Sequence, residues 1–111
     1  MGKENIKLDL GNGSLVVDKR LIDDLRGKWL ILYLVTREGP CRDNMCQVNY
    51  QLEARISERE VSQDHATLIA DGVNISIQRE IIRAIDKGRQ KVVIKKGKLK
   101  NIRIVGFNYS I

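Results

Sequence analysis

The stretch WLILYLV, residues 29–35, is the most apolar part of this chain and decides how it folds. Its apolar residues follow one another without a break, so a strand built from them has no face suited to water. We therefore predict a central β-strand here. The chain has 111 residues, enough to bury an apolar core without help from a metal, and we expect residues 1–111 to form a single domain.

Alternating apolar and polar residues mark further strands on both sides of the central one. A strand at 48–56 is expected to return antiparallel to it, and the remaining strands are predicted at 6–10, 15–17, within 66–77 around Asp71-Gly72, and at 91–95 and 99–105. Short amphipathic helices are predicted at 18–25 and 81–85, each followed by a glycine. The expected fold class is α+β, mainly β, with mixed sheets or a barrel-like sandwich and two short helices.

Two segments of the chain repeat the same order of elements. LVVDKRLIDDLRGKWLILYLV, residues 15–35, and ISIQREIIRAIDKGRQKVVIK, residues 75–95, both run strand, helix, glycine, strand, about sixty residues apart with one extra residue in the second. We predict two β-α-β units that pair into one mixed sheet system around a shared core. Two unrelated strand-helix-strand units would show the same patterning, so the likeness supports the elements and nothing further.

Both cysteines lie in REGPCRDNMC, residues 37–46, which is expected to be the tip of the hairpin after the central strand. Cys41 and Cys46 supply two soft ligands, and His65 is a possible third if the fold brings it near. A symmetric dimer would supply four thiolates, suited to zinc or an iron-sulfur cluster. Otherwise His65 is a surface or strand-edge histidine.

Thiol-disulfide exchange is the second chemistry open to these cysteines. Four intervening residues allow a bond across a hairpin tip, and closing so small a loop stabilises a fold by roughly 2 kcal/mol. Arg37 and Arg42 favour the thiolate of Cys41, whereas neighbouring acids oppose it. The third possibility is that the thiols are buried as small apolar side chains.

Basic residues gather near the end of the chain, which carries a net charge of +6. Two readings are open: the segment 87–103 is a solvated hairpin whose lysines protect an exposed edge strand, or it contacts nucleic acid or an acidic protein. In the second reading the contacts come from Lys91, Lys95, Lys96, Lys98, Lys100 and Arg103. No hydrolase or phosphate-loop motif is present, so a conventional enzyme is not expected.

In order, the motifs DKRLIDDL, KWLILYLV, GPC, NYQLEA, VSQDHATLIADGVNISI, REIIRAI and VVIKKGKLKNIRIVGFNY resemble the HesB-like domain of the A-type iron-sulfur carriers. The resemblance spans residues 18–109 and implies a compact, mostly β domain, often dimeric, whose loop cysteine binds iron or a cluster. Cys41 is similar to that cysteine because Gly39 precedes it. The carriers' C-terminal Cys-x-Cys has no counterpart here, so a three-cysteine carrier site is not expected.

These observations give two hypotheses for the function. In the first, a small cytoplasmic HesB-like protein uses Cys41 and Cys46 to bind zinc or an iron-sulfur cluster, in a homodimer, or to cycle between dithiol and disulfide. In the second, the basic hairpin makes the chain a binding module for nucleic acid or an acidic protein. The sequence has no segment long and apolar enough to span a bilayer, and no membrane partner is expected.

Overall fold

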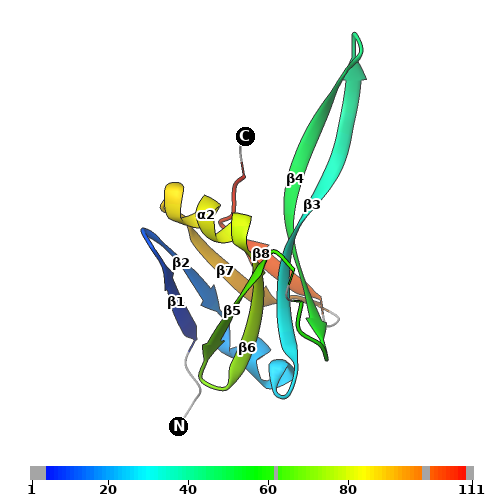
Figure 1. Cartoon of the computed structure of the whole chain (residues 1–111). Helices are drawn as coiled ribbons and strands as arrows, with labels where there is room; N and C mark the ends of the chain where they lie inside the picture. The colour runs from blue at the N-terminus through cyan, green and yellow to red at the C-terminus, as the bar shows by residue number, and fades with distance from the viewer. Residues whose placement is uncertain (1–4, 62, 99–100, 110–111) are drawn as a thin grey trace.

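Two four-stranded sheets form the described part of this protein, a computed structural model covering residues 5–61, 63–98 and 101–109, without the side chain of Gln47. The strand orders are β1-β2-β7-β8 and β4-β3-β6-β5 (Figure 1). The elements are β1 (Ile6–Leu10), β2 (Gly13–Val17), α1 (Lys19–Ile22), the 3-10 turn η1 (Asp23–Leu25), β3 (Trp29–Arg42), β4 (Met45–Ser57), β5 (His65–Ala70), β6 (Val73–Gln78), α2 (Arg79–Lys87), β7 (Lys91–Lys96) and β8 (Ile102–Val105).

The apolar core lies between the two sheets, because alternate residues of each strand point inward. Leu30 and Leu32 of β3 are fully buried, as are Ile75 and Ile77 of β6 beside them. The other sheet contributes Leu15, Val17, Val92 and Ile94, and the helical segments add Leu21, Leu25, Ile81 and Ile85. Each helical segment therefore closes the core where the chain passes from one sheet to the other.

The predicted fold class is confirmed: the protein is mainly β, with mixed sheets and two short helices, and the described strands form no closed barrel. The central strand is confirmed as well, since β3 lies between β4, antiparallel to it, and β6, parallel to it. Both strands of this hairpin are longer than predicted. The last strand begins at Ile102 in the structure; of its predicted span 99–105, residues 99 and 100 lie outside the described residues.

The repeated β-α-β pattern corresponds to a duplication of the fold. Exchanging β1–β4 with β5–β8 turns one sheet order into the other, and the two parallel pairs match, with Leu15 beside Val92 and Ile75 beside Leu30. These pairs place equivalent residues 60 positions apart before the helix and 62 after it. The second unit therefore has two extra residues, not the single one predicted, because its helical segment is longer.

Local signals explain where the first helix starts and stops. The side chain of Asp18 accepts a hydrogen bond from the backbone N–H of Arg20, which satisfies a donor that the helix leaves unpaired. Gly27 has a φ of +70°, a conformation that favours glycine, and the chain turns there into β3. The longest helix in the described residues is the nine-residue α2, so no described helix reaches across a bilayer, in line with the expectation from the sequence.

Candidate functional site

The β3–β4 hairpin extends far beyond the duplicated core. Its counterpart in the second half ends at Lys96, which corresponds to Leu34, so the core of the fold requires the hairpin only as far as the Leu34–Leu52 pair. We call residues 35–51 the arm. Figure 1 shows it standing clear of both sheets. With about 3.3 Å per residue, the eight residues of β3 beyond Leu34 give the arm a length of about 25 Å.

The overall dimensions reflect this projection. The molecule measures 58 × 32 × 26 Å, and its radius of gyration is 14.9 Å. A compact domain of this length has a radius of gyration of about 13 Å. Most arm residues are exposed, including Met45 at 75% and Val48 at 48%. The arm is therefore built from residues that contribute little to the core.

A two-residue turn closes the arm. Arg42 pairs with Met45 across it, and the two residues between them, Asp43 and Asn44, have φ values of +49° and +65°. Positive φ at both central positions matches the right-handed twist of a hairpin, and Asp and Asn tolerate it better than most residues. The local sequence therefore specifies where the chain reverses.

Cys41 and Cys46 face each other one step behind this turn and are joined by a disulfide with an S–S distance of 2.08 Å. Their register depends on a bulge. Between Glu38 and Cys41 the first strand has one residue more than the second, and Gly39 and Pro40 lie at this irregularity. Proline lacks a backbone N–H, so an interruption of the ladder suits it. The bulge places both sulfur atoms on the same side of the hairpin.

Aromatic and charged side chains fix the base of the arm. The ring of Tyr50 packs on that of Tyr109 with their centroids 4.7 Å apart. On the other face, Glu53 accepts hydrogen bonds from Arg37 at 3.3 Å and from the hydroxyl of Tyr33 at 3.4 Å. The arm is thus anchored on both faces near its root, by Tyr50 on one face and Arg37 on the other.

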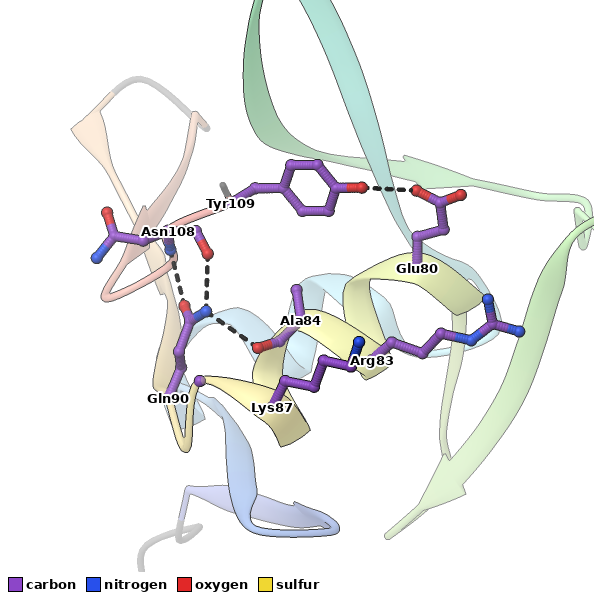
Figure 2. A pocket seen from close by; sticks show the side chains of 8 residues that line it. Glu80, Arg83, Ala84, Lys87, Gln90, Asn108 and Tyr109 are labelled. Carbon is purple, nitrogen blue, oxygen red and sulfur yellow. Dashed lines mark hydrogen bonds between the residues drawn. The ribbon is translucent and has the colours of Figure 1, made fainter. Parts of the chain in front are cut away.

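Tyr109 belongs to a C-terminal segment that crosses α2 (Figure 2). The side chain of Gln90 holds this segment by accepting from the N–H of Asn108 at 2.7 Å and donating to its carbonyl at 2.7 Å. The hydroxyl of Tyr109 donates to Glu80 at 3.0 Å. This hydrogen bond, together with partial desolvation and the charge of Glu80, raises the pKa of Tyr109 above its ordinary value near 10.

An open hollow of about 480 Å³ lies between this segment and α2, where Arg83 and Lys87 line it (Figure 2). Two neighbouring hollows follow the facing edges of β4 and β8. Their lining is largely polar and they open widely to solvent. None has the enclosed apolar lining of a usual small-molecule site, so the arm is the stronger candidate.

The other predicted ligand lies apart from the cysteines. His65 begins β5, and its Nδ1 is 3.2 Å from the hydroxyl of the buried Ser76, which donates to the carbonyl of Val61. The structure joins Cys41 to Cys46 and does not bring His65 to them. Within the described residues, no three His, Cys, Asp or Glu side chains gather as a metal site requires.

The predicted basic residues divide between several positions. Lys91, Lys95 and Arg103 lie on the solvent face of the β1-β2-β7-β8 sheet. Lys96 forms an ion pair with Asp24 at 2.9 Å, and Lys98 is exposed beyond the end of β7. Lys100 lies outside the described residues. The hairpin is therefore not uniformly cationic.

Comparison of the chain with known protein families, curated proteins and solved structures gives no match in any of the three. The resemblance to the HesB-like domain therefore stays a prediction from the sequence motifs. The pairing of Cys41 and Cys46 was one of the possibilities that their spacing allows. The packing of Tyr109 on the arm was not predicted, and no spacing or composition signal marks it.

Proposed function

We propose that this protein is a thiol-disulfide protein in which Cys41 and Cys46 cycle between a disulfide and two thiols at the end of the arm. The observation that carries the proposal is the position of the bond. Both cysteines are exposed, and they lie at the end of a projection that the duplicated core does not need. A bond in this place is accessible to another thiol and stabilises little besides the arm tip.

The Cys41–Cys46 disulfide is reduced by a thiol of the glutathione or protein-dithiol class. Its thiolate attacks one sulfur atom of the pair, a mixed disulfide forms, and the other cysteine leaves as a thiolate. A second thiol then attacks the mixed disulfide and releases the first cysteine. The reductant is oxidised to its disulfide, and Cys41 and Cys46 gain two electrons and two protons.

The arm tip gives the reaction a structural consequence. The bulge at Gly39 and Pro40 interrupts the ladder directly behind the cysteines, so the segment 41–46 is separated from the regular pairing at the root. Its turn uses two non-glycine residues with positive φ. After reduction, only the short Arg42–Met45 pairing and this turn hold the tip, and we expect it to loosen while the rest of the arm stays paired.

The prediction of a zinc or iron-sulfur site stays open within this proposal. Cys41 and Cys46 bind a metal only as thiolates, so the disulfide must first be reduced. Two thiolates are then too few for a structural site, and a second copy of the chain would have to supply the others. The cytoplasmic location predicted from the sequence belongs to the proposal, since a thiol buffer there makes the bond reversible.

A redox titration tests the proposal. The protein is equilibrated in glutathione buffers of defined ratio, and free thiols are trapped with a maleimide that changes gel mobility. We expect both thiols to appear in one two-electron step, with a midpoint between about −180 and −320 mV. Cys41→Ser and Cys46→Ser variants should each form a mixed disulfide instead.

The proposal is wrong if the bond resists every physiological ratio, because it is then a permanent staple, or if the thiols never pair. Metal analysis of the reduced protein, prepared without oxygen, then tests whether the two thiolates bind a metal. Stoichiometric zinc or iron that disappears in the double serine variant would support the metal site.

A further inference from the structure

The solvent face of the β1-β2-β7-β8 sheet is a second feature that stands apart from the arm. The register places Leu8, Leu15, Val92 and Ile104 on the side of the core, so their neighbours along each strand point outward. The outward positions are Lys7 and Asp9 of β1, Ser14 and Val16 of β2, Lys91, Val93 and Lys95 of β7, and Arg103 and Val105 of β8.

Four cations and one acid therefore share this face. Lys7, Lys91, Lys95 and Arg103 are all exposed, and among the described residues none of them has an ion-pair partner. Lys96 differs, because it pairs with Asp24. Within the described part of the basic segment 87–103, Lys96 is therefore paired with an acid, whereas Lys91, Lys95 and Arg103 are not. Strand pairing also brings Lys7, from the start of the chain, onto the same face.

Lys95 and Arg103 are directly opposite each other in the antiparallel β7–β8 pair. Like charges at such positions repel and destabilise the pair. An anion bound between the two side chains would remove this repulsion. This arrangement is the strongest sign that the face has an anionic partner.

The spacing of the cations suits an extended polyanion. Lys91 and Lys95 lie four residues apart on one strand, which is about 13 Å, and Lys7 is two strands away from β7, about 10 Å. No aromatic residue occupies an outward position, so the face offers no platform for stacking unpaired bases. Its outward apolar residues are Val16, Val93 and Val105, and only Val105 is largely exposed, at 45%, so the face offers one small apolar contact and not the aromatic or large apolar centre of a protein interface.

We infer that this sheet face binds the phosphodiester backbone of a nucleic-acid duplex through Lys7, Lys91, Lys95 and Arg103. The contacts are to phosphates and carry no base sequence. The inference does not rest on the thiol chemistry, because the arm belongs to the other sheet. Replacing both cysteines by serine should leave duplex binding unchanged, so the two proposals fail separately.

The test is fluorescence anisotropy with a labelled 20-base-pair DNA duplex at several salt concentrations. Four phosphate contacts predict a slope of about −3.6 in a plot of log K against log salt concentration. The Lys95→Gln/Arg103→Gln variant should reduce the slope by about 2 and weaken binding about 100-fold at 50 mM salt.

A matched control removes two cations elsewhere. Lys28→Gln/Arg59→Gln lowers the net charge by the same amount, but both residues are exposed outside this face, and binding should change less than threefold. Circular dichroism and thermal unfolding verify that the variants fold. Equal losses in the two variants would overturn the inference, because binding would then follow net charge alone.

Three further results would also overturn it. No duplex binding at 50 mM salt would exclude a nucleic-acid duplex as the partner. Binding to anionic phospholipid vesicles, but not to the duplex, with the same sensitivity to the Lys95→Gln/Arg103→Gln variant, would assign the face to a membrane surface. Tighter binding to a single strand than to the duplex would contradict the choice of duplex.

Discussion

Removing the arm should leave the rest of the protein folded. In the shortened chain Asn-Gly replaces residues 36–50, so that a two-residue turn joins Val35 to Gln51. These two residues are paired in the present register, and Gln51 lies six positions from Met45, which already flanks a two-residue turn. Every second residue of a strand has the same hydrogen-bonding role. The Val35–Gln51 pair is therefore of the same type as the Arg42–Met45 pair that flanks the natural turn.

The expected loss of stability follows from the few contacts that the arm makes. The packing of Tyr50 on Tyr109 contributes about 0.5–1.5 kcal/mol, and the largely exposed ion pair between Arg37 and Glu53 at most about 1 kcal/mol. The free energy of unfolding should fall by about 1–2 kcal/mol, which lowers Tm by about 4–8 °C in a chain of this size.

Urea unfolding followed by circular dichroism measures this loss. The m-value should decrease modestly, because the arm exposes little additional surface on unfolding. Tyr50→Ala in the full-length chain serves as the comparison and should account for most of the effect. A shortened chain that fails to fold, or loses more than about 4 kcal/mol, would show that the arm is part of the folding core and refute the boundary at Leu34 and Leu52.

Five other substitutions test the packing and the electrostatics. Gly13→Ala should cost at least about 2 kcal/mol in urea unfolding, because the added methyl group meets the backbone at the end of α2. Ser76→Ala should cost about 1–3 kcal/mol by removing the part-buried hydrogen bond to the carbonyl of Val61, whereas Thr67→Ala, at an exposed hydrogen bond, should cost less than about 1 kcal/mol. In an absorbance titration at 295 nm, Tyr109→Phe should remove a tyrosine that ionises above pH 10, and Glu80→Gln should lower the pKa of Tyr109. The folded state favours the neutral phenol of Tyr109, so its contribution to stability is present below pH 10 and is lost as the pH rises past the raised pKa.

The sequence predicts the strands of the core well, because each has one buried face or two. The apolar run from Trp29 to Val35 identifies β3, and the alternation from Val48 to Ile56 identifies most of β4. Beyond these segments the arm is a two-stranded ribbon with water on both faces. Because neither face is buried, the residues there do not need to alternate between apolar and polar. The sequence therefore does not show how long the arm is.

The partition of strands between sheets is also absent from local patterns. Leu15 and Leu30 are both fully buried residues of apolar strands on either side of one helical segment, but they lie in different sheets. Apolar patterning indicates that a residue is buried without showing which layer buries it. The cysteine spacing likewise allows a bond, while the pairing of Cys41 with Cys46 depends on a bulge whose position the register decides.

The duplication described above has a consequence for biosynthesis. Each sheet takes two strands from the first half of the chain and two from the second, joined by the parallel pairs β2–β7 and β3–β6. The half that is synthesised first, residues 5–57, therefore holds one hairpin of each sheet without the neighbouring strands β7 and β6 that complete the pairing. The β4-β3-β6-β5 layer is complete once β6 has emerged, but the β1-β2-β7-β8 layer must wait for β8, so the two layers can close on their shared core only after Val105 has been made.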